Sequence, residues 1–303
     1  MSHFGAIPMV TGIHILLTYN CNFTCDHCFL HCGPDSQGTF TLSQLHRLCC
    51  EVKKIPGLTW VYFEGGEPFL YYPLMVEGIS MMNGAGMKTG VVTNAYWATT
   101  GDDACIWLTP LKSLGISDLS LSDDAFHFDS EDNQAKQALQ AARKLDIPVN
   151  TICIDTPTMK KGQKKGEPVV GGGVMLRGRA VETVIEGLPR HPGDIFAQCP
   201  YEDLEDPQRV HVDCYGNVHI CQGISIGNMW KTPLSELLQS YDYTSHPICK
   251  HLAEGGPAQL AEAYDVPPRS EYVDACHFCY CIRLTLLDKF PHHLAPRQVY
   301  GLI

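Results

Sequence analysis

The sequence predicts an α/β fold, a partial (β/α)6 TIM-like barrel followed by a small cysteine-rich domain. Apolar or β-branched runs alternate with segments of helical periodicity from residue 12 to about residue 180. Such alternation is typical of parallel strands joined by helical crossovers. After about residue 185 the expected elements become short, and the cysteines crowd together. We therefore assign residues 1–185 to the barrel and 186–303 to a second domain, which a metal holds together because it has little core of its own.

Each expected element has its own run of residues. The expected strands are Gly12–Thr18, Thr59–Phe63, Lys88–Thr93, Ile116–Ser122, Pro148–Ile154 and Val174–Leu176. The expected helices are Thr41–Ile55, Tyr72–Ala85, Asp102–Leu114 and Glu131–Leu145. The stretch Lys160–Gly173 is expected to be an exposed loop, with a basic lid over a substrate as the functional alternative. In such a barrel, ligands bind beyond the carboxyl ends of the strands, where the βα loops gather.

The composition narrows the class of partner. The chain has 303 residues, and its hydrophobic content of 45% is enough for an ordinary globular core. The formal net charge of -11 argues against nucleic acid as a partner, because a phosphate backbone is bound mainly through lysine and arginine. The sequence shows neither a secretory signal nor an apolar run of about 18 residues. We expect a soluble, cytoplasmic protein without a membrane partner.

Fifteen cysteines are the most unusual feature of the composition. Without a secretory signal, so many cysteines indicate metal ligation or redox chemistry rather than a disulfide framework, and an odd number cannot all be paired. Two groups stand out, Cys21, Cys25, Cys28 and Cys32 near the start, and Cys199, Cys214, Cys221, Cys249, Cys276, Cys279 and Cys281 in the last third. Cys49, Cys50, Cys105 and Cys153 fall inside expected helices or strands and are expected to be buried.

The first group begins directly after the first expected strand, as C-x3-C-x2-C. Thiolates of Cys21, Cys25 and Cys28 can hold three irons of a 4Fe-4S cluster and leave the fourth iron open for a cofactor. A zinc site that includes His27 or His31 is the alternative. Cys32 as a further ligand would close the open position, so we expect it to be a small buried or partly exposed residue.

One strand and one helix later comes Gly65-Gly66-Glu67-Pro68. The glycines allow a close backbone approach to a ligand, and the Glu67 carboxylate can accept hydrogen bonds from an ammonium group. With this GGEP motif after C-x3-C-x2-C, the chain resembles the radical S-adenosylmethionine (radical SAM) superfamily. The resemblance implies that SAM chelates the open iron and is cleaved to a 5′-deoxyadenosyl radical. It also implies a reducing flavodoxin or ferredoxin, and a packing role for His27 beside the cluster.

Motifs after the third and fourth strands match the same superfamily. Thr93 and Asn94 resemble its TNG segment, and Ser122 and Asp124 resemble an S-x-D segment near the SAM ribose and the substrate. The resemblance therefore makes these four residues cavity residues, with Asp124 as a catalytic candidate. His127 is the second catalytic candidate, because imidazole titrates near neutral pH, and a structural hydrogen bond is its alternative role.

Arg177 belongs to a segment, Arg177-Gly178-Arg179-Ala180, that resembles a triplet found in relatives with a C-terminal cluster domain. Its guanidinium could bind the SAM carboxylate or an acidic substrate group, and we place it among the cofactor-binding candidates. A surface ion pair is the alternative.

In the second group, Cys199, Cys221, Cys276 and Cys279 are arranged as C-x16-G-x4-C, a gap and C-x2-C. This arrangement resembles the SPASM and shortened twitch auxiliary domains. The resemblance implies that the four thiolates close one auxiliary 4Fe-4S cluster, although Cys214 or Cys281 could replace one of them.

Together these features predict a radical SAM oxidoreductase or maturase that oxidatively modifies a substrate by hydrogen abstraction. In such relatives the auxiliary cluster accompanies peptide maturation, so we favour a ribosomal peptide and crosslinking or a similar modification. Alcohol dehydrogenation of a small molecule is the alternative, and a non-catalytic iron–sulfur electron carrier is a third, which GGEP disfavours. Gln222 stands where sulfatase-maturing relatives have an aspartate base, which argues against formylglycine formation.

Overall fold

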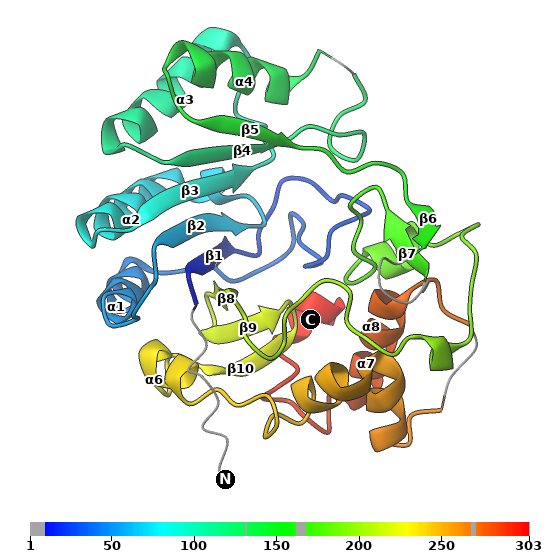
Figure 1. The fold of residues 1–303 in the computed structure, drawn as a ribbon. Helices are drawn as coiled ribbons and strands as arrows, with labels where there is room; N and C mark the ends of the chain where they lie inside the picture. Colours follow the sequence, from blue (N-terminus) through cyan, green and yellow to red (C-terminus); the bar gives the residue numbers. More distant parts are fainter. Residues whose placement is uncertain (1–9, 131, 162–167, 268–270, 303) are drawn as a thin grey trace.

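The computed structural model describes residues 10–130, 132–161, 168–267 and 271–302, and its centre is an eight-stranded sheet (Figure 1). The strand order is β10-β9-β8-β1-β2-β3-β4-β5, in which β1 to β5 are parallel neighbours in chain order. These strands are β1 (Gly12–Thr18), β2 (Trp60–Gly65), β3 (Lys88–Thr93), β4 (Asp118–Ser122) and β5 (Val149–Ile152). The connecting helices are α1 (Leu42–Val52), α2 (Tyr72–Gly84), α3 (Gly101–Leu114) and α4 (Gln134–Lys144). In Figure 1 these helices lie along the outer side of the curved sheet.

The residues of β1 show why the two faces of the sheet differ. Successive side chains of a strand point to opposite faces. Ile13 and Ile15 are fully buried in the main core, whereas His14 between them lines a cavity. Leu45 and Leu48 of α1 belong to the same core. The outer face therefore packs on the helices, and the inner face is available to polar site residues.

The last third of the chain extends this sheet. β8 (Arg209–Asp213) pairs in parallel with β1, and β9 (Asn217–Cys221) and β10 (Ile224–Asn228) follow as antiparallel strands. The other helical elements are η1 (Pro68–Tyr71), α5 (Ala180–Thr183), η2 (Gly193–Ile195), α6 (Leu234–Gln239), α7 (Cys249–Ala263), α8 (Ala275–Leu286) and η3 (Arg297–Tyr300). The domain boundary at residue 185 stays a prediction.

The predicted α/β class is confirmed, but the expected strand Val174–Leu176 is not formed. Gly172 and Gly173 have φ values of 89° and 87°, which interrupt the extended backbone that leads into it. The valine and leucine of this segment pack in a small separate apolar cluster with Val170 and Val273. Burial in that cluster replaces the pairing that we expected from the apolar pattern.

The lysine-rich stretch also differs from the expected loop. β6 (Thr158–Lys161) and β7 (Pro168–Gly171) form an antiparallel hairpin, and residues 162–167, on which the lid interpretation depended, lie outside the described residues. No helix among the described residues is long and apolar enough to cross a membrane.

Two cysteines that we expected to be buried are exposed. Cys49 is buried on α1, but Cys50 faces solvent, because consecutive helical residues point in directions about 100° apart. Cys153 is exposed just after the end of β5. The prediction of burial is therefore wrong for Cys50 and Cys153.

Candidate active site

A cavity of about 490 Å³ lies at the carboxyl ends of β1 to β5. The loop after β1 and the ends of the next strands supply its walls. Ten predicted site residues line it: Cys21, Cys25, Cys28, Gly65, Gly66, Thr93, Asn94, Ser122, Asp124 and His127. The structure therefore brings together residues that are spread over more than one hundred positions of the sequence.

The cysteine loop is fixed through its backbone. Arg179 donates from Nη1 to the carbonyl oxygen of Cys25 at 2.8 Å and from Nη2 to that of Cys32 at 2.7 Å. Gly178, at φ 63°, lies so close to Phe29 that a Cβ would be 2.5 Å from its carbonyl carbon. Only glycine fits here, and the segment after it clamps the loop.

The three thiols fit a metal cluster better than they fit isolated thiolates. Burial raises the pKa of Cys21 and Cys25 to about 12, so both stay protonated near neutral pH unless a metal displaces the proton. A hydrogen bond from Cys32 lowers the pKa of Cys28 to about 6. Cys32 is only 2% exposed, as expected for a small buried residue, and it also reaches the cavity wall.

Glu67 and Pro68 are not among the residues that line the cavity. The Glu67 carboxylate is fully buried and accepts hydrogen bonds from Thr93 Oγ1 at 2.8 Å, from the Asn94 amide at 2.7 Å and from the Phe69 amide at 3.0 Å. Burial raises the pKa of this carboxyl to about 7. Glu67 therefore joins β2 to the loop after β3, and a role of this carboxylate in cofactor binding stays a prediction.

Gly65 and Gly66 allow two segments of the backbone to approach each other closely. A Cβ at Gly66 would lie 2.1 Å from the carbonyl oxygen of Asn20, and one at Gly65, where φ is 133°, would lie 2.3 Å from that of Thr18. These contacts bring the end of β2 directly against the start of the cysteine loop.

Asp124 and His127 form a carboxylate–imidazole pair on the opposite wall. Asp124 Oδ1 lies 2.8 Å from His127 Nδ1 and accepts from the Phe126 amide, and Oδ2 accepts from the Ile154 amide at 3.2 Å. Burial opposes ionisation, but His127 outweighs it and lowers the pKa of Asp124. The His27 ring lies 5.2 Å from the His127 ring, and burial lowers the pKa of His27 to about 4. A packing role for His27 agrees with this geometry.

A second, much smaller cavity lies in the C-terminal third. Cys199, Cys221, Cys276 and Cys279 all line it. Cys199 comes from the loop before β8 and Cys221 from the end of β9, and the other two lie one turn apart on α8. Of the two candidate replacements, Cys281 does not line this cavity, and Cys214 lies near Gly38 instead.

Two buried arginines complete the second cavity. Arg177 and Arg283 are 2% and 1% exposed, and Arg177 Nη1 lies 2.8 Å from Cys221 Sγ. Among the described residues, only Glu202, at 3.3 Å, forms an ion pair with Arg177, and the Nε atoms of both arginines are buried there without a hydrogen-bond partner. Buried cations need anionic partners. The four thiolates of a closed cluster would supply that charge.

Arg177 lines the second cavity rather than the first, and its guanidinium lies 5.4 Å from the centre of the Phe29 ring. Phe29 lines the first cavity. Contact of Arg177 with SAM stays a prediction.

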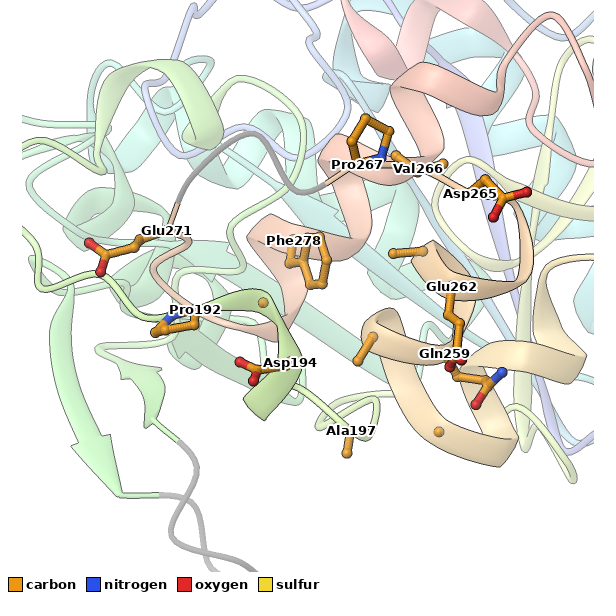
Figure 2. Close-up of a pocket in the computed structure, with 14 residues that line it drawn as sticks. Pro192, Asp194, Ala197, Gln259, Glu262, Asp265, Val266, Pro267, Glu271 and Phe278 are labelled. Carbon is orange, nitrogen blue, oxygen red and sulfur yellow. The ribbon is translucent and has the colours of Figure 1, made fainter.

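Figure 2 shows a third, open groove between η2, α7 and α8, with Phe278 at its centre. Its described lining residues include four carboxylates, Asp194, Glu262, Asp265 and Glu271, and no lysine or arginine. None of the predicted site residues lines it. The groove is thus a surface feature on the far side of α8 from the cysteines.

Comparison with known proteins agrees with this geometry. No protein-family model matches the chain. YydG of Bacillus subtilis, a protein assigned to peptide biosynthesis, is 23% identical over 256 residues, which cover 79% of this chain and 78% of YydG. The structure of BtrN in complex with AdoMet and 2-DOIA matches with a TM-score of 0.56 and 17% identity, over 88% of this chain and 98% of BtrN. SuiB of Streptococcus suis, bound to precursor peptide SuiA, is a weaker match, with a TM-score of 0.42, 13% identity and coverage of 89% and 76%.

The match to BtrN shows that this chain shares its fold. The three-thiol cavity fits a 4Fe-4S cluster with one unligated iron, because that iron would face the open space. The four-thiol cavity fits an auxiliary cluster with every iron ligated.

Two parts of the site escaped sequence reasoning. The clamp by Arg179 depends on a contact over more than 140 positions, which no local motif records. His14 and Glu64 also line the first cavity. The sequence held a signal for both residues. His14 is a polar residue inside the expected apolar strand Gly12–Thr18, and Glu64 directly follows the expected strand Thr59–Phe63.

Proposed function

We propose that this chain is a radical SAM enzyme, which abstracts a hydrogen atom from a peptide and completes an oxidative modification of it. One observation carries the proposal: Arg177, which lines the four-thiol cavity, lies with its guanidinium 5.4 Å from the ring of Phe29, which lines the three-thiol cavity. Hydrogen abstraction requires the first centre. Removal of the remaining electron requires an acceptor nearby, and a cluster in the second cavity is in a position to serve.

The chain's own residues divide the work between the two cavities. In this proposal Cys21, Cys25 and Cys28 hold the cluster whose open iron binds SAM, and reductive cleavage of SAM supplies the adenosyl radical. Gly65, Gly66, Thr93, Asn94 and Ser122 surround SAM, Asp124 and His127 face the substrate, and Cys199, Cys221, Cys276 and Cys279 hold the auxiliary cluster. A reducing flavodoxin or ferredoxin is the proposed electron source.

The peptide class is supported by YydG, which is assigned to peptide biosynthesis and matches most of this chain. A small-molecule substrate is the second candidate. One part of the cavity wall favours a small-molecule substrate. Ser120 lines the cavity, and its hydroxyl donates to Asp118 Oδ2 at 2.9 Å and to Asn150 Oδ1 at 3.2 Å. Such a polar wall suits a hydroxylated ligand.

The test is anaerobic reconstitution with iron and sulfide, followed by dithionite, SAM and synthetic peptides encoded beside the gene. We expect 5′-deoxyadenosine together with a peptide that has lost two hydrogen atoms, measured by mass spectrometry. Deoxyadenosine without any change in the peptides, but with oxidation of an added polyol, would favour the second candidate. Absence of deoxyadenosine from iron-loaded protein would contradict both.

A further inference from the structure

Three side chains on adjacent strands meet on the inner face of the sheet. His14 of β1 lies with Nδ1 2.9 Å from Glu64 Oε2 of β2, and His211 Nε2 of β8 lies 3.4 Å from Glu64 Oε1. The parallel register places His14 opposite both His211 and Tyr62. Backbone ladders on both sides therefore fix this group, and its geometry does not depend on a loop.

His14 has the arrangement of an imidazole base. Its Nδ1 is engaged by Glu64, and its Nε2 has no hydrogen-bond partner among the described residues. Both His14 and Glu64 line the first cavity and are 18% and 16% exposed at the side chain. A carboxylate at Nδ1 selects the tautomer with the proton there, which leaves the Nε2 lone pair available.

The surrounding groups keep Glu64 ionised. Burial alone would raise the pKa of Glu64, but His14 and His211 reverse this and lower it to about 2. Burial lowers the pKa of His211 well below its usual range. Tyr62 stacks on His14, with ring centres 5.0 Å apart. A negative Glu64 can stabilise an imidazolium at His14.

The group also leads towards the second cavity. Gln222 Nε2 lies 3.1 Å from His211 Nε2, and Gln222 follows Cys221 directly. The backbone carbonyl of Gln222 accepts from Arg283 Nη1 at 2.9 Å. The other imidazole–carboxylate pair of the cavity, His127 with Asp124, instead packs against His27 of the cysteine loop. The two pairs therefore face different ends of the same cavity.

We propose that His14 is the catalytic base of the oxidation and that Glu64 is its positioning residue. The inference rests on the proposed function. After a hydrogen atom has left the substrate carbon for the adenosyl radical, the carbon radical must lose a proton and an electron. His14 Nε2 takes the proton from the neighbouring N–H, O–H or C–H, and an oxidised cluster held by Cys199, Cys221, Cys276 and Cys279 would supply the acceptor for the electron. The two hydrogens lost by the substrate are thereby accounted for, and a new double bond or ring bond remains.

The first test measures the reactivity of His14 without any turnover. Iron-loaded enzyme is treated with diethyl pyrocarbonate at a series of pH values, and labelling of each histidine is followed by peptide mass spectrometry. We expect His14 to be labelled, with a midpoint that moves to lower pH in Glu64→Gln protein. The exposed His292 serves as the internal control. The proposal would be overturned if His14 did not react, or if the pH midpoint of its labelling were the same in wild-type and Glu64→Gln protein.

The second test uses the peptide that the wild-type enzyme oxidises. We expect His14→Gln to lower the product formed per 5′-deoxyadenosine by about 100-fold or more, the usual range for loss of a general base. His127→Gln is the matched comparison and should lower this ratio less. Iron content and circular dichroism report whether each variant folds. An unchanged ratio of product to 5′-deoxyadenosine in folded His14→Gln protein would refute the role of His14 as a base and leave the proposed function intact. If the wild-type enzyme formed 5′-deoxyadenosine without any oxidised peptide, the proposed function itself would be refuted.

Discussion

The two cysteine groups are built in opposite ways. The three cysteines from Cys21 to Cys28 come from one loop of eight residues and face a cavity of about 490 Å³. The four cysteines of the second cavity come from three distant segments and surround a space of about 20 Å³. Three thiols beside open space leave room for a second ligand next to a cluster. Four thiols around a closed space leave no room beyond a cluster itself. The same ligand type is therefore directed to different chemistry by the space around it.

Buried charge follows the same division. Arg177 contacts the thiol of Cys221 and Arg283 lines the same enclosed cavity, whereas Arg179 holds the loop of the open group through its backbone carbonyls. An enclosed anionic cluster cannot be hydrated, so fixed cations must balance it. An open cluster can be balanced by solvent or by a charged ligand.

The largest effect is expected from Cys28→Ala at the open group. It removes one of three ligands, so we expect 5′-deoxyadenosine formation to fall below detection while about half of the iron remains. Liquid chromatography of the nucleoside and iron analysis measure both quantities. Cys50→Ala, on the exposed side of α1, is the control that should keep both. If the Cys28 variant still cleaved SAM, the open group would not be the only site of SAM cleavage, and the distinction between the two groups would fail.

Cys276→Ala is the matching change at the enclosed group. It should also remove about half of the iron, but its main effect should be on stability, because Arg177 and Arg283 would stay buried without their thiolate partners. Removing one partner of a buried ion pair costs about 3–5 kcal/mol. Thermal denaturation under anaerobic conditions measures this, with Cys281→Ala as the control outside the cavity. Equal losses in both variants would mean that Cys281 is a ligand after all.

Sequence reasoning predicted well what is encoded by neighbours in the chain. The strands β1 and β3 begin and end at the expected residues, and the loop cysteines face one cavity, because period-two burial and short spacings are local properties. GGEP was also found in its expected place, but the hydrogen bonds of Glu67 within the chain were not predicted. A carboxylate after a glycine pair can turn to either side, and the three donors around Glu67 come from elements that the motif does not include.

Long-range pairing was the part that the sequence did not disclose. Arg177 and Cys221 are 44 positions apart, and His14 and His211 become neighbours only because β8 adds to the edge of β1. No periodicity within either strand specifies that pairing. The fold class and the ligand types were therefore predictable, whereas the charges and bases around them were not.

A moderate effect is expected from Arg177→Met, which keeps much of the volume but removes a cation beside Cys221. The auxiliary cluster becomes harder to reduce when a positive charge is lost, so its midpoint potential should fall by about 60 mV, a tenfold change for one electron. Redox titration followed by electron paramagnetic resonance measures the potential, and Arg177→Lys should restore most of it. A potential that stays constant in Arg177→Met would show that this buried charge does not balance the enclosed group.

The smallest effect concerns Glu67, the buried acid beneath the open group. No lysine or arginine of the described part of the chain forms an ion pair with it, and burial raises its pKa from 4.5 to about 7, so the folded state keeps this proton to higher pH than the unfolded state does. Between these two values the unfolded chain binds fewer protons, and the free energy of unfolding falls as pH rises. Relative to wild type, Glu67→Gln should therefore gain about 1 kcal/mol between pH 6 and pH 7, measured from anaerobic denaturation midpoints. If the difference between the two proteins stays flat over this interval, the carboxylate is already ionised at pH 6. The open group would then tolerate a buried negative charge that the enclosed group must balance with arginine.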